Sequence, residues 1–297
     1  MKKAVPAVNT SEFYVGLFIV FLIVATVKYF FPTSIPFELF EFFKFSFNWE
    51  ALLGIPWMLL LFGPVLSLVV SILTKNSRSE NWQIKDGFDH DIWTSIKAGI
   101  FEEISYRWLT FYFLIIAFSI RDVIFTWLMS ISWISAILSL PWWAIVCILL
   151  VVNVIGLISY VVATDKSTGC LISTIGGIVL VFVIIIDLTV ALGLVKWWYT
   201  DLMLPLINFI TLGKMNPQLF GYSWMVGAAL VSSNWDFGKG HLYQGPVGWL
   251  NSWIFGMLMF WFTFHFGLLF AMLIHAIYDI VIHVIRYVDA NLELIAS

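Results

Sequence analysis

Long apolar runs constrain the fold of this chain more than any other feature. They cover residues 13–31, 52–74, 93–120, 123–140, 142–164, 170–195, 218–233 and 250–284. A helix needs about 20 apolar residues to cross a bilayer, and the last run is long enough for two short spans, or for one long span and part of another. Only helices and closed barrels satisfy their backbone in lipid, and these runs lack the alternation of barrel strands. We therefore predict an all-α, polytopic transmembrane helix bundle with about eight membrane helices.

Composition indicates the same class of protein. Of the 297 residues, 61% are hydrophobic and 11% charged, and the mean hydropathy is +0.97. A water-soluble globular protein is far less apolar. The net charge is −3 and like charges never run beyond a pair, so we set nucleic-acid binding aside. Cys147 and Cys170 form neither a CxxC motif nor a zinc-binding spacing.

The placement of basic residues predicts the topology. The longest polar connection, residues 75–91, carries three basic side chains, and Lys2 and Lys3 lie two spans earlier. By the positive-inside rule, we expect the N-terminus and the 75–91 loop to be cytoplasmic. The first apolar run exceeds a signal-peptide core and lacks a cleavage site, which predicts a retained anchor. Residues 32–50 and 196–217 are rich in aromatic side chains and predict segments at headgroup depth.

Three charges interrupt the apolar stretch 100–120: Glu102, Glu103 and Arg107. Burying one ion at the bilayer centre costs at least about 2.5 to 3.5 kcal/mol, so such residues usually have a function. On an α-helix Glu103 and Arg107 share a face and can pair, whereas Glu102 points about 100° away. Glu102 is then the less compensated carboxylate and the candidate general base. The alternative is that all three charges merely tie two helices together.

Two further pairs at a spacing of four residues lie in the second half of the chain. Phe237 and His241 follow the run that ends at residue 233, and His275 and Asp279 lie within a strongly apolar stretch. Taken alone, each has an ordinary explanation: an interfacial histidine for the first pair, and a polar stripe facing the bundle interior for the second. Asp187 is another isolated acid, for which helix packing is the simplest interpretation.

Taken together, the three groups form an ordered pattern. The first motif is Glu102-Glu103-x-x-x-Arg107, the second is Phe237-x-x-x-His241, and the third is His275-x-x-x-Asp279. A serine pair, Ser232-Ser233, precedes the second motif, and the run Gly267 to Ala271 leads into the third. This order, with each motif on or beside a membrane helix, resembles the CAAX prenyl endopeptidase and bacteriocin-immunity family (CPBP or Abi family) of intramembrane proteases.

The resemblance implies catalytic roles for the first two motifs. Glu102 would be the general base that activates water, with His241 sharing that water. Glu103 and Arg107 would hold the geometry of the site. Peptide hydrolysis needs such a base, a positioned water molecule, and donors aimed at the developing negative charge, so the residue types suit the reaction.

The third motif would supply the oxyanion site. The resemblance implies that His275 and Asp279 stabilise the tetrahedral intermediate. Many members of the family have Asn where this chain has Asp279, and an ionised carboxylate cannot donate a hydrogen bond. Asp279 would therefore act protonated, or would orient His275 by accepting from its ring N–H.

The length of chain between the first two motifs departs from the family pattern. The resemblance covers about 96–285, and 134 residues separate Arg107 from His241. We expect inserted helices over about 121–222. Because added helices can pack at the edge of a bundle, one integral membrane domain over 1–297 is the simplest description.

The insertion leaves a rival for the second-motif histidine. His265 follows Trp261 at the same spacing of four residues. His265 lies only ten residues before His275, and we expect both on one helix, which leaves little room for a separate motif. We therefore prefer His241.

The function implied by the resemblance is an integral membrane endopeptidase that cleaves near the carboxyl end of a peptide. Its partners would be the lipid bilayer and a peptide or prenylated protein substrate. We expect no metal and no other cofactor, because the His-Glu-x-x-His helix that indicates zinc is missing. A non-catalytic immunity or binding protein is the main alternative, and a proton-coupled transporter is less well supported because no internal repeat is visible. The sequence carries no signal for an oligomeric state.

Overall fold

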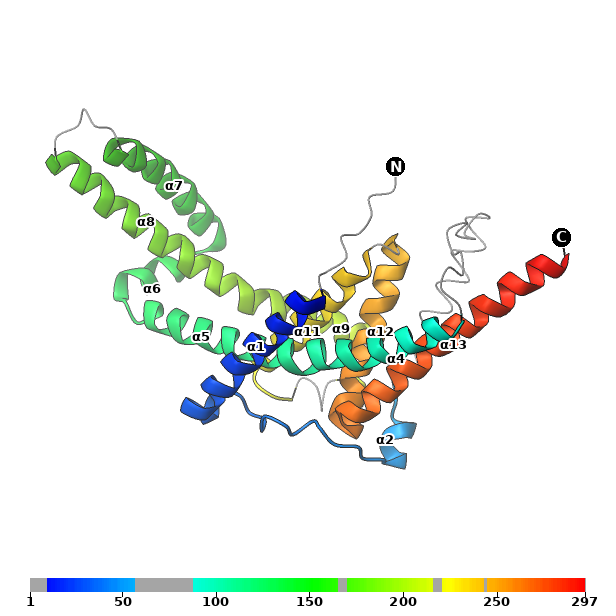
Figure 1. Ribbon diagram of the computed structural model, residues 1–297. Coiled ribbons are helices and arrows are strands. Elements are labelled where there is room, and N and C mark those ends of the chain that lie inside the picture. Colours follow the sequence, from blue (N-terminus) through cyan, green and yellow to red (C-terminus); the bar gives the residue numbers. More distant parts are fainter. Residues whose placement is uncertain (1–9, 57–87, 165–169, 216–220, 243–244, 297) are drawn as a thin grey trace. The chain divides into compact units, whose positions relative to one another are not determined.

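The computed structural model describes residues 10–56, 88–164, 170–215, 221–242 and 245–296, and the regular elements in these ranges are all helical (Figure 1). The α-helices are α1 (Thr10–Phe30), α2 (Trp49–Leu53), α4 (Phe88–Glu102), α5 (Phe111–Met129), α6 (Ser132–Leu138), α7 (Trp142–Thr164), α8 (Cys170–Trp197), α9 (Leu204–Ile210), α11 (Trp224–Gly240), α12 (Gly245–Phe266) and α13 (Leu268–Ala296). Two π-helical segments, η2 (Glu103–Thr110) and η3 (Trp198–Met203), and a short 3-10 turn, η1 (Pro32–Ser34), join them. The predicted all-α fold is confirmed.

Three helical stretches in the described part of the chain are long and apolar enough to cross a membrane. They are Ile92–Met129, Trp142–Thr164 and Thr174–Ile210, and two shorter apolar helices cover Tyr14–Phe30 and Leu268–Ile282. These helices support a membrane protein, but they do not confirm the predicted number of about eight. Most of the 52–74 run, residues 75–87 of the lysine-bearing loop, and the N-terminal lysines lie outside the described residues.

One predicted boundary is wrong. The sequence suggested separate spans over 93–120 and 123–140, but α5 continues unbroken to Met129 and only the short α6 follows. Arg121 does not end the helix, because its guanidinium has polar partners: its Nη1 pairs with Asp122 Oδ1 at 3.1 Å, and its Nη2 donates to the carbonyl of Leu192 on α8.

The last apolar run forms two helices, α12 and α13, separated at Gly267. This glycine has a φ of +94°, which side-chain-bearing residues rarely adopt, and a β-carbon there would collide with the carbonyl of Lys44. His265 and His275 therefore lie on different helices, and the expectation that they share one is wrong.

The chain divides into two compact units. The first combines Met1–Phe118 with Met203–Ser297, and the second is Ser119–Leu202, which lies almost wholly within the 121–222 range assigned to inserted helices. Within the second unit, α7 and α8 pack side by side.

Small and polar residues line the contact between α7 and α8. A β-carbon on Gly156 would lie 3.0 Å from the side chain of Val183, so the two helices approach closely there. Asn153 Nδ2 on α7 donates to Asp187 Oδ1 on α8 at 3.2 Å. Asp187 is thus engaged between two helices, as its packing interpretation expects.

In the first unit, α13 packs along α4, and α11 and α12 pack against each other. The 35–47 segment connects to this bundle through its backbone. The carbonyl of Phe42 accepts from Leu268 N at 2.7 Å, and Ser46 N donates to the Phe266 carbonyl at 2.8 Å. The segment is therefore attached on both sides of the Gly267 break.

The same segment also supports η2. Trp108 Nε1 donates to the Leu39 carbonyl at 2.7 Å, and Tyr112 Oη donates to the Glu38 carbonyl at 2.9 Å. Phe37, only 2% exposed, packs its ring against Tyr112. This part of the segment predicted to lie at headgroup depth is thus packed against protein.

Candidate functional site

The first motif lies where an α-helix widens into a π-helix. Glu102 is the last residue of α4 and Glu103 the first of η2, so an α-helical description of the motif is wrong beyond Glu102. Single wide turns of this kind occur frequently at functional sites. The predicted pair forms nevertheless, with Arg107 Nε 3.3 Å from Glu103 Oε2 and both side chains fully buried.

His275 on α13 connects the third motif to the first. Its Nδ1 donates a hydrogen bond to Glu103 Oε1 at 2.7 Å. Its Nε2 lies 3.7 Å from Glu102 Oε2 and 3.7 Å from Asp279 Oδ2, beyond hydrogen-bond range but close enough for a strong electrostatic interaction. One histidine ring thus faces three carboxylates.

The three carboxylates differ in their access to other molecules. Glu103 is fully buried, whereas the side chains of Glu102 and Asp279 are 33% and 29% exposed. Glu103 can therefore act only on its protein neighbours. Glu102 and Asp279 are the acids that a substrate or a water molecule could reach.

The second motif packs on the same cluster through Phe237. The Phe237 ring lies 4.1 Å from Arg107 Cζ, and its centroid is 6.1 Å from that of His275 and 4.7 Å from that of His241. His241 follows the end of α11, and its Nδ1 donates to the Phe237 carbonyl at 3.0 Å. Glu102 interacts electrostatically with both histidines. The structure thus brings together the seven residues that the three motifs name.

His265, the rival histidine, has a different environment. It stacks on Trp261 with ring centroids 4.0 Å apart, and its Nδ1 donates to the Trp261 carbonyl at 2.8 Å. No interaction recorded for the described residues connects it to Glu102 or Glu103. The geometry therefore supports His241 as the second-motif histidine.

Sequence reasoning missed the residues that enclose Arg107. Asn234 on α11 is fully buried, and its Nδ2 donates to the Trp253 carbonyl on α12 at 2.7 Å. Gly256 on α12 allows close packing, since a β-carbon there would lie 2.7 Å from Arg107 Nη2 and would overlap Asn234 Oδ1. The only sequence feature that pointed to these residues was the polar run Ser-Ser-Asn at 232–234, inside an otherwise apolar stretch. The sequence alone does not say which residues that run contacts.

A serine also joins α11 to the first motif. Ser233 is fully buried, and its Oγ donates to the carbonyl of Tyr106 on η2. Ser233 thus helps fix η2 against α11.

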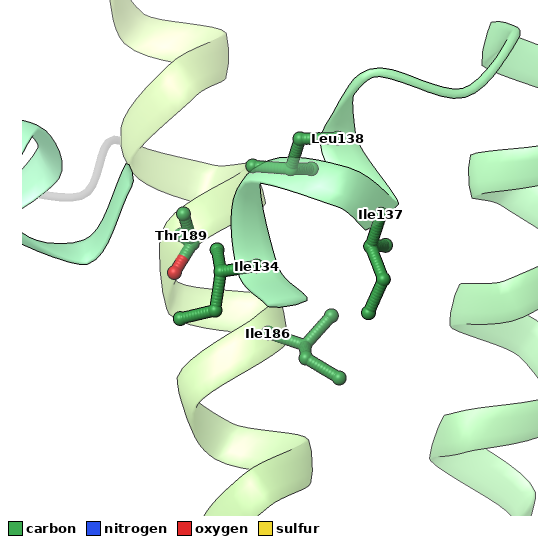
Figure 2. A pocket seen from close by; sticks show the side chains of 5 residues that line it. All are labelled: Ile134, Ile137, Leu138, Ile186 and Thr189. Atoms are coloured by element: carbon green, nitrogen blue, oxygen red, sulfur yellow. The ribbon is translucent and has the colours of Figure 1, made fainter. Parts of the chain in front are cut away.

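Among the described residues, neither a cluster of metal-binding side chains nor a cavity provides a second candidate for a functional site. Within the described ranges, no three His, Cys, Asp or Glu side chains are arranged to hold a metal ion. The expectation of metal-free chemistry stays a prediction. Figure 2 shows a small hollow in the second unit, between α6 and α8, lined by Ile134, Ile137, Leu138, Ile186 and Thr189. It has no charged lining group and is too tight to admit a water molecule.

Comparison with known proteins leaves the family open. No protein-family model matches the chain, and neither does any curated protein or solved structure.

Proposed function

We propose that the protein is an integral membrane endopeptidase of the CAAX prenyl protease type, which hydrolyses a peptide bond in a lipidated or membrane-associated peptide. One observation carries the proposal. His275 hydrogen-bonds to Glu103 and faces Glu102, while Phe237 of the second motif contacts Arg107. Three motifs that are far apart in sequence thus share one polar network, and this shared network is what supports the proposal.

Glu102 is the proposed general base. It is partly exposed, and it interacts electrostatically with His241. A water molecule held between Glu102 and His241 would lose one proton to the carboxylate as its oxygen attacks the substrate carbonyl, and protonated Glu102 would pass that proton to the leaving amine as the C–N bond breaks. A general base of this kind accelerates a reaction by about 10²- to 10⁴-fold.

Glu103 and Arg107 are proposed to position the catalytic groups. Both are fully buried, so neither reaches a substrate. Glu103 accepts from His275 Nδ1 with one oxygen and faces Arg107 with the other. This fixes the His275 ring so that Nε2 faces the exposed side of the cluster.

His275 is the proposed oxyanion donor, through Nε2–H; because Nδ1–H already donates to Glu103, this role requires the imidazolium form, in which both ring nitrogens carry a proton. Asp279 lies 3.7 Å from this nitrogen, too far for a hydrogen bond in this conformation. An ionised Asp279 cannot donate to an oxyanion, so we assign it the role of holding His275 electrostatically.

A non-catalytic immunity or binding protein is the second candidate. Its supporting observation is the completeness of the network, because a buried ion pair with a bonded histidine also serves to join η2, α11 and α13. Transport is less well supported, because the sequence shows no visible internal repeat.

The decisive experiment uses the full chain in lipid nanodiscs with a quenched fluorogenic peptide and a farnesylated CAAX peptide. We expect Glu102→Gln to lower cleavage by about 10²- to 10⁴-fold. The matched control is Glu50→Gln, which changes an exposed acid on α2 and should leave cleavage intact. Equal cleavage by wild type and Glu102→Gln would refute the mechanism, and a cellular immunity phenotype that survives Glu102→Gln would favour the second candidate.

A chelator series in the same assay tests the absence of a metal. We expect cleavage to be unaffected by chelation. Loss of activity that zinc restores would show that the two glutamates and the histidines act as metal ligands instead.

A further inference from the structure

Arg107 has far more hydrogen-bonding capacity than Glu103 uses. A guanidinium carries five N–H donors, and this one is completely buried. Its charge faces Glu103, and the rings of Phe237 and Phe260 lie 4.1 Å and 5.6 Å from Cζ. No described residue accepts a hydrogen bond from Nη1 or Nη2. Buried charged donors without an acceptor are costly, so the neighbouring acceptors are important for this side chain.

Asn234 is a neighbour of Arg107 with a buried acceptor oxygen that has no hydrogen-bond donor among the described residues. Its Nδ2 is committed to the Trp253 carbonyl, which settles the orientation of the amide. Its Oδ1 is buried and accepts no hydrogen bond within the described part of the chain. Oδ1 and Arg107 Nη2 both border the point where Gly256 would carry a β-carbon. A donor and an acceptor, each without a partner, thus meet over one glycine.

We propose that Asn234 is a positioning residue: its Oδ1 is the acceptor that Arg107 Nη2 reaches over Gly256 after a small adjustment of the two side chains, which holds a chain of contacts from Asn234 through Arg107 and Glu103 to His275. The inference rests on the proposed function only for its activity readout. Each link is local: Arg107 Nε lies 3.3 Å from Glu103 Oε2, and Glu103 Oε1 receives His275 Nδ1–H at 2.7 Å.

The chain explains how α11 and α12 influence a histidine on α13. A carboxylate whose two oxygens serve two partners cannot rotate without losing one of them. If Arg107 shifts toward the space left by a truncated Asn234, Glu103 rotates with it and His275 loses its acceptor. Gly256 is required because any side chain there would separate Arg107 from Asn234.

The test records ¹⁵N spectra of histidine-labelled protein in nanodiscs. The chain has five histidines, and His275→Gln identifies the His275 signals. We expect Asn234→Leu to shift both ring-nitrogen signals of His275. If cleavage is measurable, kcat should fall by about 10- to 100-fold with little change in KM, because Asn234 does not touch substrate.

Two further variants keep the test decisive. Asn234→Asp preserves the shape of the side chain, so it gives a folded protein if Asn234→Leu does not. We expect it also to shift the His275 signals, because a new carboxylate competes with Glu103 for Arg107. Asn208→Leu is the matched control, since Asn208 Oδ1 on α9 is likewise buried without an acceptor role among the described residues.

The outcomes separate the two proposals. Unchanged His275 signals in a folded Asn234 variant would overturn the positioning role, whatever the activity. Equal shifts in Asn208→Leu would also overturn it, because they would show a general loss of packing. If the wild type cleaves no peptide while the Asn234 variants alone shift His275, the proposed function fails and the positioning role stands.

Discussion

Gly99 and Ala276 bring the backbones of α4 and α13 into direct contact. A β-carbon on Gly99 would lie 2.7 Å from the Ala276 nitrogen and 2.9 Å from its Cβ, closer than such atoms pack. Small residues permit this approach between membrane helices. Ala276 follows His275, and Gly99 lies about one turn before Glu103, so this crossing sets how near His275 comes to the first motif.

Gly99→Ala should therefore separate α4 from α13. We expect a loss of about 1 to 3 kcal/mol in the free energy of unfolding, because overpacking forces the backbones apart. Denaturant unfolding in detergent measures it. Gly177→Ala on α8 is the control, since a β-carbon there would meet no described atom within 4 Å and should be neutral or stabilising. Equal stability of the two variants would contradict the role of the crossing.

Gly267→Ala should destabilise the break between α12 and α13. Both strain at a positive φ and a collision with the Lys44 carbonyl oppose the new side chain. Gly213→Ala isolates the first effect, because Gly213 has a φ of +72° but no described neighbour within 4 Å of its β-position. We expect the Gly267 variant to be the less stable by about 1 kcal/mol or more in thermal unfolding. A Gly267 variant that is more stable than the Gly213 variant would show that the Lys44 backbone moves aside at little cost.

Arg107→Leu should destabilise the protein by about 3 to 5 kcal/mol, since it leaves Glu103 as an uncompensated buried charge. The double variant Glu103→Leu with Arg107→Leu should recover much of this loss while abolishing the His275 contact. Lys239→Leu tests an exposed pair, with Asp236 at 3.0 Å, and should change stability by about 0 to 1 kcal/mol. A double variant no more stable than Arg107→Leu would argue against charge compensation.

Substitution of His241 and of His265 should have different effects on peptide cleavage. His241→Ala should abolish peptide cleavage, because His241 interacts with Glu102. His265→Ala should leave kcat within a factor of about three while affecting stability through the lost Trp261 stack. The opposite result would reassign the second motif to His265.

The Asn153–Asp187 hydrogen bond should couple α7 to α8. In a double-mutant cycle with leucine at each position, we expect a coupling energy of about 0.5 to 2 kcal/mol. Unfolding in mixed detergent micelles measures it. Additive effects of the two changes would show that the hydrogen bond contributes nothing to the helix pair.

Sequence alone predicted the helices that have clear ends. The first residue of α7, Trp142, matches the start of the apolar run at 142–164, because Pro141 precedes it. Arg121 gave the opposite result: a charge normally ends a membrane span, but its partners Asp122 and Leu192 keep it inside α5. The difference lies in tertiary contacts, which local patterns do not record.

The residues of the candidate cluster could be named from the sequence, but their geometry could not. The spacing of four residues indicated the Glu103–Arg107 pair, and the order of motifs indicated that His275 belongs with it. The π-helical turn and the contribution of Gly256 depend on how α11 and α12 pack on η2. Gly256 lies in an apolar run, where the sequence does not distinguish it from any other glycine. Only the structure shows that it packs against Arg107.

The local ion pair also has a consequence for biogenesis. Glu103 and Arg107 are four residues apart, whereas the Glu103–His275 bond joins residues 172 apart. During synthesis the two charges therefore reach the translocon together, long before the histidine exists. Each alone would oppose insertion by about 2.5 to 3.5 kcal/mol, but paired on the nascent helix they neutralise each other. The pair that contacts His275 in the folded protein would therefore also lower the free-energy cost of inserting its own helix into the membrane.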